Sequence, residues 1–288
     1  MDTKEIIKKV RKIEIKTRRL SNHIFSGEYH SVFKGRGMTF SEVRPYQFGD
    51  DVRTIDWNKT ARFNEPYIKI FEEERELTLL LVVDISQSVF FGTRKQLKRE
   101  TITEIAATLA FAAIQNNDKV GLLLFSNQIE LYIPPKKGRS HVLRIIRELI
   151  EFEPSDTQTD LVKAFQFIGG VLKRHAILFA LSDFTDLNYK KALDVVARKH
   201  DVTGIRIYDE KEQRIPNIGL VYMQDMETGK IKAVNTSFKK VRMEYAKYYQ
   251  KRYHYFINSF TKAGAGTIHL QSNEDYVKKL MGYFKRYA

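Results

Sequence analysis

The chain has 288 residues, of which 43% are hydrophobic and 29% are charged, and it contains no cysteine. That length and apolar content suffice for one large domain or a domain with a substantial extension, and the lack of cysteine excludes disulfide bonds, thiolate metal ligands and cysteine nucleophiles. The formal net charge of +14 suits acidic partners, but the basic residues are spread among acidic stretches, so charge alone does not indicate specific nucleic-acid binding.

The first 76 residues differ in composition from the rest. Residues 1–25 mix basic and apolar positions, which predicts a helix, and they lack the apolar core of a secretory signal peptide. Residues 26–76 carry glycines and prolines among aromatic side chains, which is typical of short strands and turns. No apolar stretch reaches the length of a transmembrane segment, so we expect a cytoplasmic protein whose residues 1–76 form a helix and a small β-rich N-terminal extension.

We expect charged and aromatic side chains of the extension to stabilise its structure. Three aspartates are expected to form ion pairs with nearby arginines, and a second acidic site is the alternative. The residues concerned are Asp50, Asp51 and Asp56 with Arg44, Arg53 and Arg62. Trp57 is expected to pack against neighbouring side chains.

From Leu77 onward, apolar strand-like runs alternate with helix-like stretches. Strands are expected at 78–84, 120–125, 129–133, 176–181, 202–207, 218–223, 230–234 and 267–270. Helices are expected at 95–115, 141–152, 160–172, 189–199, 237–261 and 274–287, with a turn at 227–229. This alternation predicts an α/β fold for residues 77–288, in which a mostly parallel central sheet is flanked by helices.

Three oxygen-bearing side chains follow the first of these strands. Asp84, Ser86 and Ser88 alternate in the loop after residues 78–84, and alternate positions of a loop can face one point. One carboxylate and two hydroxyls are hard oxygen donors of the kind that Mg²⁺ or Mn²⁺ prefers. A polar loop whose hydroxyls cap the next helix is the alternative interpretation.

Two further loops carry similar side chains. Residues 155–160 precede a predicted helix, and residues 182–186 follow a predicted strand. Ligands of open α/β sheets bind at the carboxyl ends of strands, where all three loops are expected to meet. Each carboxylate or hydroxyl can instead cap the next helix. The side chains open to that alternative are Thr159, Asp160, Asp183 and Asp186.

Together these side chains resemble the metal-ion-dependent adhesion site of von Willebrand factor A domains. That site combines an Asp-x-Ser-x-Ser sequence with a distant threonine and a distant aspartate. The resemblance assigns the metal to Asp84, Ser86, Ser88, Thr159 and Asp183. It also implies that the hydroxyls bind the metal directly and that the carboxylates act mainly through water.

The preceding block extends the resemblance over most of the chain. Residues 35–46, 49–57 and 60–62 are similar to the signature of a bacterial family called domain of unknown function 58. Members carry this block directly before a von Willebrand A-like domain, and many are encoded beside MoxR-type AAA+ ATPases. The resemblance therefore implies that such an ATPase is a partner in protein assembly or maturation.

The predicted function is a non-enzymatic module in which Mg²⁺ or Mn²⁺ joins the protein to an Asp or Glu of a protein partner. A phosphoester hydrolase that uses the same metal is the first alternative, and it would need Asp160 or Asp186 as its general base. A basic nucleic-acid-binding adaptor is the second alternative. No catalytic residue and no organic cofactor is assigned.

Overall fold

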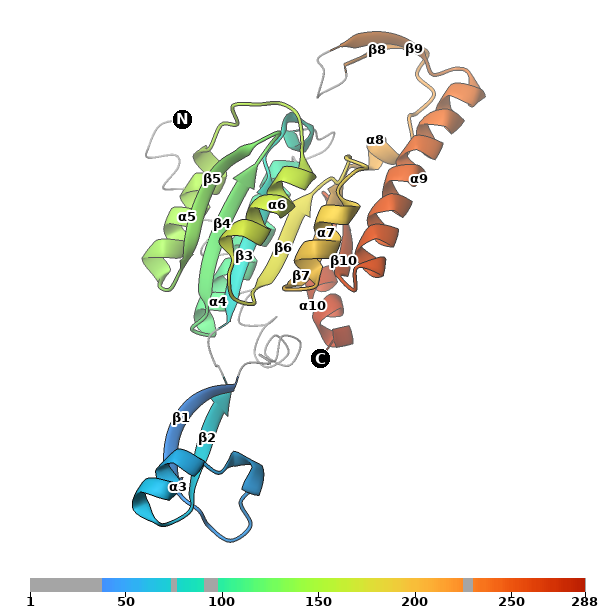
Figure 1. The fold of residues 1–288 in the computed structure, drawn as a ribbon. Helices are drawn as coiled ribbons and strands as arrows, with labels where there is room; N and C mark the ends of the chain where they lie inside the picture. The colour runs from blue at the N-terminus through green and yellow to red at the C-terminus, as the bar shows by residue number, and fades with distance from the viewer. Residues whose placement is uncertain (1–37, 74–76, 91–97, 225–229, 288) are drawn as a thin grey trace. The chain divides into compact units, whose positions relative to one another are not determined.

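The computed structural model describes residues 38–73, 77–90, 98–224 and 230–287 (Figure 1). The chain divides into a small unit, Lys34–Leu77, and a large unit that contains Thr78–Ala288. The predicted N-terminal helix and the predicted turn at 227–229 lie outside the described residues.

The small unit is built on two antiparallel strands, β1 (Met38–Pro45) and β2 (Tyr67–Glu73). Between them lie a short 3₁₀ helix, η1 (Val52–Thr54), and the helix α3 (Trp57–Phe63). The β-rich prediction for this part of the chain is confirmed for the described strands, but the helix α3 was not predicted. Its seven residues are too few to show a helical period in the sequence.

Side chains of the small unit follow the predicted pattern only in part. Arg44 donates two hydrogen bonds of 2.8 Å to the carboxylate of Asp50, which confirms that ion pair. Asp51 and Asp56 instead cap η1 and α3, because a carboxylate just before a helix accepts hydrogen bonds from its unpaired N–H groups. Trp57 is 70% exposed, so the prediction that it packs is wrong. It is the first residue of α3, a helix in which no residue is buried.

The large unit contains a six-stranded sheet in the order β10-β7-β6-β3-β4-β5. Its strands are β3 (Thr78–Asp84), β4 (Lys119–Phe125), β5 (Ile129–Lys136), β6 (Ile177–Ser182), β7 (Asp201–Tyr208) and β10 (Gly266–Gln271). All neighbouring strands pair in parallel except β5, which is an antiparallel edge strand beside β4. The predicted mostly parallel sheet is therefore confirmed.

Helices cover both faces of this sheet (Figure 1). They are α4 (Lys98–Gln115), α5 (Arg139–Glu151), α6 (Leu161–Val171), α7 (Lys190–Ala197), α9 (Lys239–Lys262) and α10 (Tyr276–Tyr287). α6, α7 and α9 bury their apolar residues on one face, where Leu80 and Val82 of β3 point. α4 and α5 lie on the other face, as does α10, whose Phe284 ring contacts Phe179 of β6. No helix among the described residues is long and apolar enough to cross a membrane.

Two smaller elements complete the large unit. The helix α8 (Glu210–Gln213) follows β7, and an antiparallel pair, β8 (Leu220–Gln224) and β9 (Ile231–Asn235), precedes α9. Figure 1 shows this strand pair beyond the N-terminal end of α9, away from the central sheet. The strand pair was predicted from the sequence, whereas α8 was not.

A glycine of β7 allows α9 to lie close to the sheet. A Cβ atom placed on Gly204 would stand 2.5 Å from the ring of Phe260 and 2.8 Å from that of Phe256, both of which belong to α9. Real Cβ atoms do not approach other atoms so closely, so any larger residue must push the helix away. Gly204 therefore fixes the distance between β7 and α9.

We expect Gly204→Ala to lower the free energy of unfolding by about 1–3 kcal/mol, because the added methyl group overpacks a closely fitted core. Urea unfolding followed by circular dichroism measures the change. Gly169→Ala is the matched control, since a Cβ there meets no described atom within 4 Å and the exposed helix position favours alanine by about 0.5–1 kcal/mol. Equal stability of the two variants would contradict this account of the α9 contact.

Candidate metal centre

The candidate site lies where the strand order of the sheet changes direction. β3 has β4 on one side and β6 on the other, so the connections that leave β3 and β6 diverge. Such a switch point is where open α/β sheets bind ligands. Asp84 is the last residue of β3, Ser182 is the last residue of β6, and Asp183 follows it. The sheet thus places two carboxylates at adjacent strand ends.

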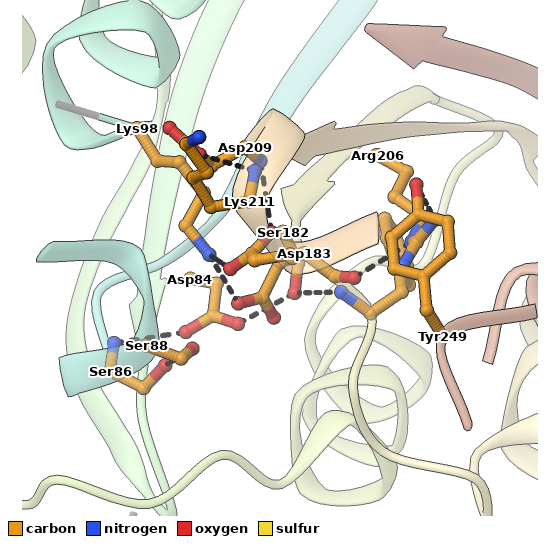
Figure 2. Close-up of polar contacts among 12 residues, drawn as sticks. Asp84, Ser86, Ser88, Lys98, Ser182, Asp183, Arg206, Asp209, Lys211 and Tyr249 are labelled. Atoms are coloured by element: carbon orange, nitrogen blue, oxygen red, sulfur yellow. Dashed lines mark hydrogen bonds and ion pairs between the residues drawn. The ribbon is translucent and has the colours of Figure 1, made fainter. Parts of the chain in front are cut away.

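The loop after β3 is organised by the carboxylate of Asp84, which is fully buried. Its Oδ1 accepts a hydrogen bond of 2.9 Å from the backbone N–H of Ser86, and its Oδ2 accepts one of 2.6 Å from Ser182 Oγ. The hydroxyl oxygens of Ser86 and Ser88 are 3.1 Å apart (Figure 2). The predicted Asp-x-Ser-x-Ser residues therefore do turn their oxygens toward one place.

The loop after β6 holds Asp183 through its own backbone and through two cations. Asp183 Oδ2 accepts a hydrogen bond of 2.9 Å from Lys98 Nζ, and the backbone carbonyl of Asp183 accepts one of 3.0 Å from Arg206 Nε (Figure 2). The next residue, Phe184, has a left-handed backbone with φ of 50° and donates its N–H to Ser182 Oγ at 2.9 Å. Asp183 Oδ1 is buried and has no hydrogen-bond partner among the described residues.

The loop that contains Thr159 is hydrogen-bonded to the segments that follow β3 and β4. The backbone N–H of Gln87 donates to the carbonyl of Thr157 at 3.1 Å, and that of Asp160 donates to the carbonyl of Ser126 at 2.9 Å. The Asp160 carboxylate caps α6, which confirms the capping interpretation for this residue. Thr159 Oγ1 is buried and, like Asp183 Oδ1, has no hydrogen-bond partner within the described part of the chain.

The pKa values of the two carboxylates are shifted in opposite directions by their surroundings. Burial and the negative charge of Asp183 raise the pKa of Asp84 to about 7. Burial alone would also raise the pKa of Asp183, but the charge and hydrogen bond of the Lys98 ammonium hold it below its usual value. Asp183 is therefore the carboxylate that is already compensated, whereas Asp84 forms no ion pair with a cation among the described residues.

The donor set fits a hard divalent cation. The donors are three hydroxyls, those of Ser86, Ser88 and Thr159, and the carboxylates of Asp84 and Asp183, and such oxygen ligands suit Mg²⁺ or Mn²⁺ better than Zn²⁺. No group of three or more His, Asp or Glu that could hold a metal occurs in the described residues. Any metal at this place would thus depend on the hydroxyls, as the sequence pattern predicts. The assignment of all five ligands stays a prediction.

Three residues of the site were missed in the sequence. Lys98 lies four residues before Ile102 on the predicted apolar face of its helix, so its position in the helical period was a signal for burial. Glu212 and Arg206 carried no such signal, because β7 and α8 reach the site only through the folded sheet.

Comparison with known families gives one match over most of the chain. The family model described as "Protein of unknown function DUF58" matches residues 42–255. An uncharacterized protein of Mycobacterium bovis, Mb1516, is 28% identical over 235 residues, which cover 81% of this chain and 74% of that protein.

Solved structures provide a second comparison. The conserved hypothetical protein BatB from Bacteroides thetaiotaomicron is 15% identical with a TM-score of 0.47, covering 73% of this chain and 98% of BatB. The SpRpn10 VWA domain is 9% identical with a TM-score of 0.39, covering 71% of this chain and 93% of that domain.

Proposed function

The chain belongs to the DUF58 family of proteins of unknown function, and from its candidate metal centre we propose that it is a non-enzymatic protein-interaction module that depends on a divalent cation. The observation that supports this most directly is the pair of buried oxygens without hydrogen-bond partners among the described residues, Thr159 Oγ1 and Asp183 Oδ1. Buried polar atoms normally have partners, and a cation would provide one for both. The proposed ligands are Asp84, Ser86, Ser88, Thr159 and Asp183.

The chemistry of the ligands determines what the module binds. When bound, Mg²⁺ or Mn²⁺ supplies a Lewis-acidic position that an Asp or Glu carboxylate of the partner can fill. Only two of the proposed ligands are carboxylates, and one of them is shared with Lys98, so the ligands neutralise the cation incompletely and it can attract an acidic side chain. In this proposal the module works in the cytoplasm, and the family resemblance adds a MoxR-type AAA+ ATPase as the candidate partner in protein assembly or maturation.

A hydrolase would need a general base beside the metal, and the two candidates have other contacts. Asp160 Oδ1 accepts the backbone N–H of Lys163 at 3.0 Å. Asp186 Oδ1 accepts the backbone N–H of Asn188 at 2.9 Å. Each carboxylate stabilises the turn or helix start in which it lies. These contacts favour binding over hydrolysis as the function of the centre.

Calorimetric titration with Mg²⁺ tests the proposal. We expect the wild-type protein to bind and Ser86→Ala to bind about tenfold or more weakly, because a direct oxygen ligand is lost. The fold should survive, since the Ser86 hydroxyl is hydrogen-bonded to that of Ser88, within the same loop. Ser155→Ala is the matched control, since that hydroxyl is bonded to Glu130. Equal binding by Ser86→Ala and the wild type would place the metal elsewhere.

A further inference from the structure

A lysine is buried beside the candidate metal centre. Lys98, the first residue of α4, is fully buried, although lysine side chains are almost never buried without a partner. Its Nζ lies 2.9 Å from Asp183 Oδ2 and 2.6 Å from Glu212 Oε1. Figure 2 shows the side chain reaching from α4 to the carboxylate of Asp183. The ammonium therefore lies against one of the proposed metal ligands.

Glu212 holds this lysine from a fixed position. Its second oxygen, Oε2, accepts the backbone N–H of Asp209 at 2.9 Å, and the Asp209 carboxylate accepts the backbone N–H of Lys211 at 2.8 Å. Asp209 and Glu212 form the capping box of α8, which holds Oε2 of Glu212 while Oε1 contacts Lys98. Burial alone would lower the pKa of Lys98, but the charges of Asp183 and Glu212 hold it above its usual value. Two carboxylates within hydrogen-bond distance thus favour the charged form of the Lys98 side chain.

We propose that Lys98 is a built-in cation of the metal centre, which compensates Asp183 in the absence of metal and limits the affinity of the centre for a divalent cation. This inference rests on the proposed function and deepens it. One oxygen of Asp183 contacts Lys98, and the other has no hydrogen-bond partner within the described part of the chain, so a metal ion at that second oxygen shares a single carboxylate with the ammonium. Like charges on one carboxylate repel each other.

The consequence is a centre that holds its ion loosely until a second carboxylate arrives. With Asp183 shared, Asp84 is the one carboxylate of the proposed ligand set that is not paired with the lysine. A carboxylate from the partner then adds negative charge to the centre, which offsets the repulsion between Lys98 and the metal ion. Lys98 is a positioning residue in this account, because it acts on the metal through Asp183.

The test compares Mg²⁺ binding by the wild type and by Lys98→Met, using calorimetry and thermal unfolding in Mg²⁺ and in EDTA. We expect Lys98→Met to bind Mg²⁺ about tenfold or more tightly, since the repelling charge is gone. Without metal it should unfold at a lower temperature than the wild type, because Asp183 and Glu212 have lost their cation, and Mg²⁺ should raise that temperature more than it does for the wild type.

Two further variants keep the test decisive. Lys190→Met is the control for net charge, because Lys190 is exposed and pairs with Asp194 on α7. It should bind Mg²⁺ as the wild type does. If Lys98→Met does not fold, Lys98→Met/Glu212→Gln replaces it, since the Glu212 charge is then not left without its cation. The double variant should also bind Mg²⁺ more tightly than the matched single variant Glu212→Gln.

The outcomes separate this inference from the proposed function. If both wild type and Lys98→Met bind Mg²⁺, the variant more tightly, both hold. If the wild type binds and the variant binds equally or more weakly, the proposed function stands and the role of Lys98 is refuted. If the variant binds and the wild type does not, Lys98 is the resident cation and the metal-dependent function is refuted. If neither binds Mg²⁺, both are refuted.

Discussion

Asp84→Asn is expected to weaken the affinity for Mg²⁺ about a hundredfold or more, which corresponds to about 2.8 kcal/mol of binding free energy. Binding of the partner should be lost with the metal. Asp84 supplies the carboxylate of the centre that Lys98 does not share. Asparagine has nearly the same shape, and its amide oxygen can still accept the backbone N–H of Ser86. The variant therefore removes the charge and keeps the loop.

The same substitution should leave the metal-free protein folded, and at neutral pH at least as stable as the wild type. Burial raises the pKa of Asp84 to about 7, which shows that its charged form is disfavoured in the folded protein. Calorimetry with Mg²⁺, thermal unfolding in EDTA and recovery of Mg²⁺-dependent partners from lysate measure the three effects. Asp186→Asn is the matched control in a neighbouring loop. Full Mg²⁺ affinity of Asp84→Asn would contradict the assignment of the centre.

The second large effect is on stability. Phe184→Ala is expected to lower the free energy of unfolding by about 3–5 kcal/mol, because it removes a fully buried ring from an aromatic cluster. The Phe184 ring centroid lies 4.6 Å from that of Phe256, 5.3 Å from that of Phe260 and 5.8 Å from that of Tyr189. Urea unfolding of the wild type and the variant measures the loss.

Phe184→Leu separates packing from backbone strain. Residue 184 has a left-handed backbone, which is unfavourable for leucine, alanine and phenylalanine alike, so the strain remains in both variants. Leucine should retain part of the packing and cost less than alanine. Because Asp183 precedes this residue, Phe184→Ala should also weaken Mg²⁺ binding. A loss below about 1 kcal/mol for alanine would show that the cluster repacks without this ring.

The sequence predicts the sheet well because its central strands, such as β3 and β6, are buried on both faces. The run at 78–84 was predicted with the bounds of β3, since continuous apolar residues followed by Asp84 leave little choice of end point. The helix α8 escaped detection because four residues contain a single turn and no hydrophobic period. Burial of both faces is thus a strong sequence signal, and a short polar helix is a weak one.

The candidate site was predictable where its residues form a local pattern. Asp84, Ser86 and Ser88 are close in sequence, and their oxygens meet in the loop after β3. Lys98 and Glu212 are far apart in sequence, and nothing near either of them indicates an ion pair. Their contact is produced by the order of the strands, which brings α8 and the start of α4 to one edge of the sheet.

The position of Trp57 makes the two units optically distinguishable. It is the single tryptophan of the chain and belongs to the small unit, where it is exposed, whereas the large unit contains tyrosine and phenylalanine but no tryptophan. Fluorescence excited at the red edge of tryptophan absorption therefore reports on the small unit, and the tyrosine signal reports mainly on the large unit. One unlabelled sample thus yields two denaturation curves, whose coincidence or separation shows whether the two units unfold together.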